Sequence, residues 1–519
     1  MALPAFMKRY LLFVGLILLL HNAPVCAQKT GLPHSTPEAQ GVSSAGIDSF
    51  LTAVNRSKNE FHSFMLLRHG KVVAQGWWNP YSRELKHTMY SCSKSFTSTA
   101  IGFLVSEKKL SLYDKVISFF PNSLPDTVKP YLRELSIRDL LTMSVGQPQD
   151  PTFYLPIQSN DWVKSFLALP ITDKPGTKFL YNSMATFMLS AIVQRVTGKK
   201  EYDYLKPRLF DPLGITGIDW ETDNHGINTG GWGLRLKTED MAKFGQFYLQ
   251  KGKWSGKQLL PAKWIEEATG YKIDQAPDTP KNRKAFNDWM QGYCYQFWRC
   301  QHNAFRGDGA LGQYIIVMPD QDAVIAITSE SVNMQAQLDA VWTYLLPAMK
   351  PHVLHANPTA YATLRKHLAA LHISPAGNSA KPGIALNGAA KTWSFQPNSL
   401  NIKSISLRND KGIYHLTLKT DSASYTFELT SGKWTYGLTK MQGPSLLMKA
   451  KENFAFLVPY RVECCYGWTD TNTLQMKLRY IESPHTETIT CHFKGQNMDT
   501  DVAYSFYFGS NKLTLHGKQ

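Results

Sequence analysis

The sequence predicts an α+β protein, in which an antiparallel sheet flanked by helices is followed by a small all-β domain. The chain has 519 residues, too many for a single hydrophobic core, so two domains are expected. Up to about residue 350, helical and strand-like stretches interleave without a regular βαβ repeat. Residues 351–388 are rich in Pro, Ala, Gly and Lys, and strand-period alternation takes over after them. We therefore expect a first domain at 28–350, a linker at 351–388 and an antiparallel β domain at 389–519.

Two hairpins are expected in the first domain. Residues 62–78 form two apolar runs around Arg68, His69 and Gly70, which predict the turn. Residues 312–329 form two more around the sequence Pro-Asp-Gln-Asp, which is typical of a turn. Hairpins of this kind favour an antiparallel sheet.

Three stretches of the first domain are predicted to be helical. The apolar pattern that starts at residue 91 predicts one helix, and residues 135–146 predict a second that ends at a glycine. Residues 238–250 predict a third helix, capped by Thr238. Its apolar face is formed by Met241, Phe244, Phe247 and Tyr248.

The C-terminal β domain is predicted only from the alternation of apolar and polar residues. Apolar residues occupy every second position in several stretches, among them 425–429, 474–480 and 489–493. Period-two alternation gives each strand one apolar face, which must be covered by another part of the sheet. The domain is therefore predicted to be a sandwich or a small barrel.

The N-terminal segment predicts export. Lys8 and Arg9 precede the apolar run YLLFVGLILLL, and residues 25–27 (VCA) offer small side chains for cleavage. The run is too short for a comfortable membrane span. We expect residues 1–27 to be a signal peptide and the mature protein to be periplasmic or secreted. No later segment is apolar enough to predict a membrane span.

The distribution of charge and the spacing of the cysteines argue against nucleic-acid binding and against a zinc site. The net charge is +16 and the sequence pI is about 9.3, but Lys and Arg are scattered, so nucleic-acid binding is disfavoured. Six cysteines follow the signal peptide, and in an exported chain they can form disulfides. Cys294 with Cys300, and Cys464 or Cys465 with Cys491, are candidate pairs. Their spacings do not resemble a zinc site, and no metal or organic cofactor is implied.

The stretch SCSKSFTSTAIGFL (91–104) places a serine and a lysine at the start of an apolar helix. Positions i and i+3 share a helix face, so Lys94 would lie beside Ser91. Burial would lower the pKa of the lysine and allow it to activate the serine hydroxyl. By itself, a Ser-x-x-Lys spacing is common by chance.

Two further stretches carry candidate chemistry. Tyr181 and Ser183, in YNS, lie at a bend before an apolar helix, where the tyrosine could reach Ser91 or simply pack. FRGDGALGQYIIVMP (305–319) places glycines at the start of an edge-like strand, where a substrate backbone could approach. A plain glycine-rich hairpin is the alternative for this third stretch.

Together these stretches resemble the class C β-lactamase-like branch of the serine β-lactamase and penicillin-binding-protein superfamily. The resemblance covers about residues 35–350 and includes RHGKVVAQGWWNPY (68–81), LLTMSVG (140–146) and GGWGLRLKTEDMAKFGQFYL (230–249). It implies the fold of that superfamily, with an all-helical lobe beside the sheet. It also implies a serine hydrolase acting on an amide or ester bond.

The resemblance implies a role for each matched residue. Ser91 would form an acyl-enzyme, Lys94 would help move its proton, and Tyr181 would be the shared base and acid. Ser183 would belong to the substrate site. The oxyanion would bind the backbone N–H of Ser91 and an N–H of the strand near Gly309. The residues assigned here to substrate and oxyanion binding are Ser183, Arg306, Gly307, Asp308, Gly309 and Gly312.

The chain departs from the lactamase pattern at three points. Met143 replaces a histidine, Ser183 stands where lactamases carry asparagine, and RGDG (306–309) stands where the Lys/His-Thr/Ser-Gly motif is expected. These departures favour an esterase, a D-amino-acid peptidase or an aminohexanoate-oligomer hydrolase over an efficient β-lactamase. The remaining alternatives are a β-lactam substrate and a silent scaffold that binds peptide or cell-wall fragments.

Overall fold

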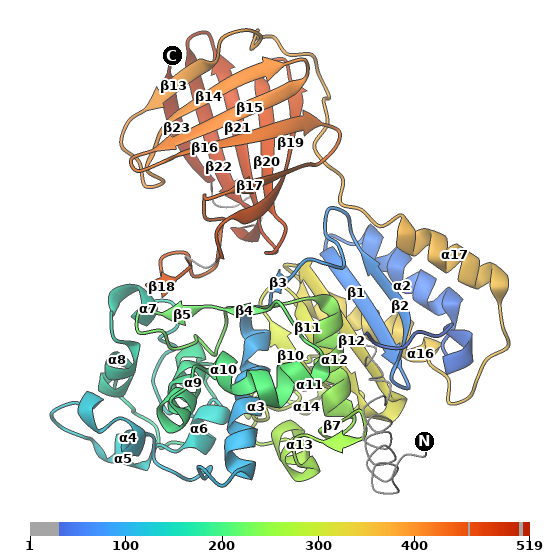
Figure 1. Cartoon of the computed structure of the whole chain (residues 1–519), viewed down its shortest axis with the longest axis vertical. Helices are drawn as coiled ribbons and strands as arrows, with labels where there is room; N and C mark the ends of the chain where they lie inside the picture. Colours follow the sequence, from blue (N-terminus) through green and yellow to red (C-terminus); the bar gives the residue numbers. More distant parts are fainter. Residues whose placement is uncertain (1–30, 455–456, 508–511) are drawn as a thin grey trace, which may run out of the picture. The chain divides into compact units, whose positions relative to one another are not determined.

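A computed structural model describes residues 31–454, 457–507 and 512–519. The predicted signal peptide, 1–27, lies outside the described residues. Residues 33–519 form one unit, in which a mixed α/β region precedes a sheet of long strands (Figure 1). None of the described helices is long and apolar enough to span a bilayer. The α+β fold class is confirmed.

The first region is built on a six-stranded sheet with the order β2-β1-β12-β11-β10-β9. Every pairing in this sheet is antiparallel. Both predicted hairpins are present: β1 pairs with β2, and β11 pairs with β12. The strands are β1 (Glu60–Arg68), β2 (Lys71–Trp77), β9 (Trp298–Arg299), β10 (Phe305–Gly309), β11 (Gln313–Met318) and β12 (Ala323–Glu330).

Helices cover both faces of this sheet, which explains why β11 and β12 are buried at every position. On one face, Ile316 and Ile325 belong to a core that also contains Phe50 of α2 (Ser44–Arg56). On the other face, α12 (Thr238–Leu249) packs against β11 and β12 (Figure 1). A Cβ added at Gly245 of α12 would lie 2.5 Å from Val324 Cγ1, so glycine allows this close approach.

A lobe of helices lies between β2 and β9 in the chain and carries part of the site (Figure 1). Its central helices are α3 (Ser93–Ser106) and α9 (Ser183–Thr197), which contact each other. The shorter helices are α4 (Val116–Phe119), α5 (Pro130–Glu134), α6 (Ile137–Leu141), α7 (Leu155–Gln158), α8 (Trp162–Ala168), α10 (Glu201–Leu205) and α11 (Asp211–Leu213). The helical lobe implied by the family resemblance is therefore present.

The C-terminal sheet closes into a barrel. Its order is β16-β15-β14-β13-β23-β22-β21-β20-β19-β17, and β16 also pairs with β19. Trp393, Trp468 and Leu478 belong to the core inside it. The strands are β13 (Lys391–Phe395), β14 (Ile402–Asp410), β15 (Ile413–Thr420), β16 (Ser424–Ser431), β17 (Thr435–Thr439), β19 (Tyr460–Asp470), β20 (Thr473–Tyr480), β21 (Thr486–Lys494), β22 (Asn497–Tyr504) and β23 (Lys512–Lys518). Of the two predicted forms, the barrel is the one observed.

Two local predictions are wrong. The helix expected over 135–146 is only α6, because Met143 has a φ of 56° and turns the chain toward the site. Thr238 does not cap α12, since Lys237 occupies that position and the Thr238 hydroxyl instead bonds Ser63 Oγ at 2.7 Å.

The candidate disulfide pairs are also absent. The cysteines of the described residues are all free and buried: Cys92, Cys294, Cys300, Cys464, Cys465 and Cys491. Cys464 and Cys491 contribute to the apolar interior of the barrel. These thiols act as small core side chains rather than as crosslinks.

Candidate active site

Ser91 lies in a tight turn that leads directly into a buried helix. Residues Tyr90–Cys92 form a single 3₁₀ turn, and α3 continues from Ser93. Almost every position of α3 is buried, so its start is fixed by packing against the rest of the lobe. Ser91 remains partly exposed at the mouth of the helix, whereas Lys94 is 1% exposed. The helix therefore presents the serine outward and encloses the lysine.

The Lys94 amine is held by three oxygens. Its Nζ lies 3.0 Å from Ser91 Oγ and 2.9 Å from Ser183 Oγ, and it donates to Gly231 O at 2.7 Å. Burial lowers the pKa of Lys94 to about 7 despite the nearby carboxylates of Asp150 and Asp308. A lysine with this pKa is partly neutral near pH 7 and can accept a proton.

Tyr181 reaches the same serine from the other side. Its hydroxyl hydrogen-bonds the side chain of Ser91, and its ring centroid lies 4.9 Å from Lys94 Nζ. Burial is the main cause that raises the pKa of Tyr181, so its hydroxyl keeps its proton. The segment before it is anchored on Met143, whose carbonyl accepts from the Leu180 N–H at 2.8 Å.

The start of α9 fixes Ser183. Asn182 caps the helix by accepting from the Ala185 N–H at 3.1 Å, and its amide donates to Gln147 at 2.6 Å. Its own N–H donates to Met143 Sδ at 3.3 Å. The methionine that replaces histidine in LLTMSVG thus supports the turn between Tyr181 and Ser183.

Strand β10 brings its glycines against the turn Tyr90–Cys92, here called the nucleophile turn because it carries the predicted nucleophile Ser91. A Cβ added at Gly309 would lie 2.2 Å from Met89 O, and one added at Gly307 would lie 3.1 Å from Ser95 Oγ. Strand β9 pairs only with Phe305 and Arg306 of β10. Beyond Arg306, no strand of the described residues pairs with the outer edge of β10, and all five residues of the strand are buried.

Arg306 and Asp308 form a buried ion pair on the opposite side of the strand from the glycines. Arg306 Nε donates to Asp308 Oδ2 at 2.7 Å, and Nη1 donates to Asp288 O at 2.9 Å. Arg306 is fully buried, and its guanidinium also faces the ring of Trp289 at 4.5 Å. The predicted substrate residue Arg306 therefore contacts protein groups and is not open to a substrate.

Gly312 lies in the turn between β10 and β11. Its φ is 91°, and a Cβ there would lie 2.0 Å from Gln337 Oε1 and 2.4 Å from Ser329 Oγ. The turn requires glycine at this position. The structure thus brings together Ser91, Lys94, Tyr181, Ser183 and Gly309, and it places Arg306 and Gly312 in supporting positions.

Sequence reasoning missed two contributors. The carbonyl of Gly231 accepts from Lys94, and the signal available was the glycine pair at 230–231, where a Cβ at 231 would lie 2.7 Å from Ser183 O. The C-terminal domain also reaches this region. Its strand β18 (Glu452–Asn453) pairs with β5 (Thr222–Asp223), and Glu452 accepts from Trp232 Nε1 at 2.9 Å.

We expect Gly309→Ala to slow covalent labelling of Ser91 by about tenfold or more, because the new Cβ would displace the backbone at Met89 and with it the nucleophile turn. The measurement is the rate of labelling by a fluorophosphonate. Gly437→Ala is a suitable control, since its Cβ would meet only Val462 Cγ1 at 3.6 Å. Equal labelling rates in both variants would contradict this prediction.

Comparison with known proteins finds one matching family model and several relatives by sequence. A protein-family model described as Beta-lactamase matches residues 62–348. A 6-aminohexanoate-dimer hydrolase of Paenarthrobacter ureafaciens is 24% identical over 284 residues, which cover 51% of this chain and 71% of that enzyme. An Escherichia coli O157:H7 protein assigned as a D-alanyl-D-alanine carboxypeptidase is 24% identical over 241 residues, which cover 40% of this chain and 55% of that protein.

Solved structures agree on the fold. A Bacillus anthracis protein assigned as a 6-aminohexanoate-dimer hydrolase superposes with a TM-score of 0.50 at 22% identity, over 61% of this chain and 86% of its own length. The family match ends at residue 348, so the C-terminal barrel lies outside it. The two relatives described above carry the names of hydrolases.

Proposed function

Because this chain belongs to the Beta-lactamase family of serine hydrolases and related penicillin-binding proteins, we propose that it cleaves an amide or ester bond through an acyl-enzyme on Ser91. The observation that carries the proposal is the position of the Lys94 amine. It lies 3.0 Å from Ser91 Oγ, is enclosed by protein, and has a pKa lowered to about 7. A serine paired with such an amine is an activated nucleophile.

In the first half-reaction, Lys94 is the base. A neutral amine has two N–H groups and one lone pair. Gly231 O takes one N–H and Ser183 Oγ takes the other, which directs the lone pair at the Ser91 hydroxyl. As Ser91 Oγ attacks the carbonyl carbon, its proton moves to Lys94 Nζ. The developing oxyanion is stabilised by the backbone N–H of Ser91 and by an N–H at the open edge of β10.

Tyr181 then acts as the acid that protonates the leaving group. Because burial keeps its hydroxyl protonated, Tyr181 is suited to donate a proton to the departing nitrogen or oxygen and to recover one from Lys94. The same groups, used in reverse, activate the water that hydrolyses the acyl-enzyme. In the first half-reaction, this assignment gives the role of base to the lysine and the role of acid to the tyrosine.

The proposed substrates are linear amides and esters. One relative is named as a hydrolase of an aminohexanoate dimer, and another as a carboxypeptidase of D-alanyl-D-alanine. Both of these substrates contain an amide bond. Beyond Arg306, the outer edge of β10 pairs with no strand of the described residues, and we assign the backbone pairing of an extended substrate to this edge. The buried Arg306 leaves RGDG without a cation for the carboxylate of a β-lactam, which disfavours that substrate class. We also propose that the protein is exported, on the basis of the N-terminal segment.

The test is intact-mass spectrometry of the full chain after treatment with a fluorophosphonate. Addition of one probe to the wild type and none to Ser91→Ala would support the nucleophile, and a screen of esters, D-amino-acid amides and penicillins would then define the substrate. The absence of an adduct on the wild type would contradict the hydrolase mechanism and favour the binding scaffold.

The pH dependence of labelling follows from the lysine. Because the neutral form of Lys94 is the active one and its pKa is lowered to about 7, the acylation rate is expected to rise with pH, by about tenfold between pH 6 and pH 8. The measurement is the pH profile of fluorophosphonate labelling. A rate that is constant or falls over this range would rule out Lys94 as the base.

A further inference from the structure

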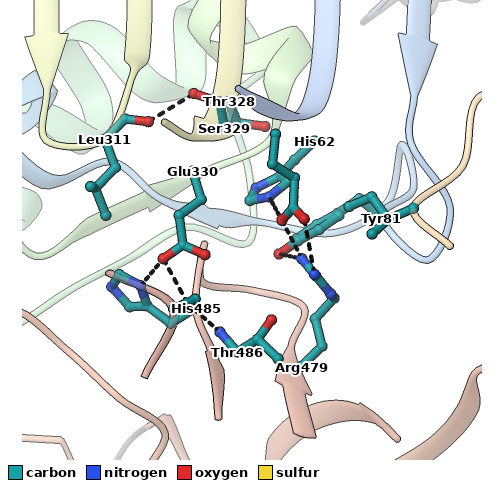
Figure 2. Close-up of polar contacts among 12 residues, drawn as sticks. His62, Tyr81, Leu311, Thr328, Ser329, Glu330, Arg479, His485 and Thr486 are labelled. Atoms are coloured by element: carbon teal, nitrogen blue, oxygen red, sulfur yellow. Dashed lines mark hydrogen bonds and ion pairs between the residues drawn. The ribbon is translucent and has the colours of Figure 1, made fainter. Parts of the chain in front are cut away.

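Two polar clusters join the C-terminal barrel to the hydrolase region (Figure 2). In the Arg479 cluster, Arg479 of β20 donates to both carboxylate oxygens of Glu60 of β1, at 2.7 and 3.2 Å. In the His485 cluster, His485 lies in the turn after β20, and its Nδ1 lies 2.6 Å from Glu330 Oε1, at the end of β12. Ser505 Oγ donates to the same oxygen at 2.8 Å.

The second ring nitrogen of His485 faces the residue before the nucleophile. His485 Nε2 is hydrogen-bonded to the hydroxyl of Tyr90, and His485, Tyr90 and Glu330 are 0%, 6% and 6% exposed. The carboxylate of Glu330 accepts from Nδ1–H, and in this tautomer of the neutral imidazole Nε2 accepts from the hydroxyl of Tyr90. The hydrogen bonds therefore run in one direction, from Tyr90 through His485 to Glu330.

The backbone of Tyr90 is in a conformation that needs support. Its φ is 43°, in the left-handed region that bulky residues rarely adopt, and it directly precedes Ser91. Such conformations cost about 1–3 kcal/mol and persist only where the surroundings fix them. Its carbonyl accepts from Ser93 Oγ at 2.6 Å, and its hydroxyl also contacts Ser445 and Leu446. The described partners of this hydroxyl all come from the C-terminal domain.

We propose that His485 is a positioning residue for Ser91: it holds Tyr90, and through Tyr90 the nucleophile turn, so that the C-terminal barrel is a working part of the active site. This inference rests on the proposed function. The hydroxyl of Tyr90 is the attachment point, and Glu330 orients the imidazole that binds it. The backbone of Tyr90 sets the direction of Ser91 Oγ toward Lys94 and of the Ser91 N–H toward the oxyanion.

The expected effect is on chemistry more than on ligand binding. Release of Tyr90 would let its φ relax and would move Ser91 Oγ away from its position 3.0 Å from Lys94 Nζ. A misplacement of about 1 Å in reacting groups costs about a hundredfold in rate. Substrate contacts on β10 and α9 would remain.

Two substitutions of the histidine separate its two contacts. The amide nitrogen of an asparagine occupies the place of Nδ1, and the amide of a glutamine reaches the place of Nε2. His485→Asn therefore keeps the bond to Glu330 and loses Tyr90, whereas His485→Gln keeps Tyr90. We expect the maximal rate of fluorophosphonate acylation to fall by about tenfold or more in His485→Asn, with the half-saturating probe concentration unchanged, and to recover in His485→Gln.

Two further variants complete the test. Tyr90→Phe should lose as much as His485→Asn, and the double variant should lose no more than either single one, because both remove the same bond. Arg479→Gln is the matched control, since it breaks the other cluster at the same junction without touching the nucleophile turn. It should lower the Tm while leaving the maximal acylation rate unchanged.

The outcomes distinguish this inference from the proposed function. A wild-type rate in His485→Asn, or an equal loss in Arg479→Gln, would overturn the positioning role while leaving the hydrolase mechanism intact. An unlabelled wild type would overturn both. If His485→Asn does not fold, Tyr90→Phe decides the question, because it leaves every barrel side chain in place.

Discussion

Lys94→Met is expected to lower the acylation rate of Ser91 by about 10²–10⁴-fold, the usual contribution of a general base. The substitution removes the amine that lies 3.0 Å from Ser91 Oγ and keeps an unbranched side chain in the enclosed space behind it. Because burial disfavours the lysine charge, its loss should leave the fold intact. The measurement is the fluorophosphonate labelling rate, with circular dichroism to verify folding.

Lys94→Arg separates a base from a positive charge. Arginine keeps a cation near Ser91 but does not accept a proton at any working pH. If Lys94 is the base, the arginine variant should be as slow as the methionine variant, and its pH profile should lose the rise through about 7. An arginine variant with near wild-type activity would assign the lysine an electrostatic role instead.

Arg306→Met is expected to destabilise the protein by about 3–5 kcal/mol, because it leaves the buried carboxylate of Asp308 without its partner. The measurement is urea unfolding of the full chain. The double variant Arg306→Met/Asp308→Asn should recover part of the loss, since no buried charge remains.

An exposed ion pair supplies the control for this experiment. Lys251 and Glu266 lie 2.8 Å apart, and their side chains are 64% and 59% exposed. Lys251→Met should leave the unfolding midpoint unchanged, because exposed pairs contribute little. If Arg306→Met also left it unchanged, the ion pair would not be the structural element that its burial indicates.

The parts of the site that the sequence predicted are those that local geometry determines. Ser91 and Lys94 are three residues apart on one turn of helix, so their proximity follows from the helix alone. The bend that carries Tyr181 and Ser183 precedes a helix with a clear apolar pattern. The two hairpins of the sheet were likewise visible as apolar runs around turn residues.

The alternation of side chains along a strand explains why the glycines of RGDG (306–309), and not its charged residues, face the nucleophile turn. Arg306 and Asp308 alternate with Gly307 and Gly309, so the sequence shows that the charged pair and the glycines lie on opposite faces of β10. It does not show which face meets the nucleophile turn. The structure places the glycines there, because only residues without a Cβ fit against Met89 O and Ser95 Oγ.

The contacts of the C-terminal domain could not be predicted, since no local pattern encodes them. His485 reads as an ordinary turn residue between two strands, and its partners Tyr90 and Glu330 are distant in the chain. The burial of all three side chains becomes visible only when the barrel and the hydrolase region are both folded.

The hydrogen bond between Tyr90 and His485 can form only after the chain as far as His485 has been synthesised. The two residues are 395 positions apart in the chain. At about 5–20 residues per second, the ribosome needs about 20–80 s to make the intervening segment. During that interval the chain contains Ser91 and Lys94 but not His485, so the proposed positioning contact has no partner. A chain that ends before the barrel is therefore expected to lack the support that we propose for Tyr90.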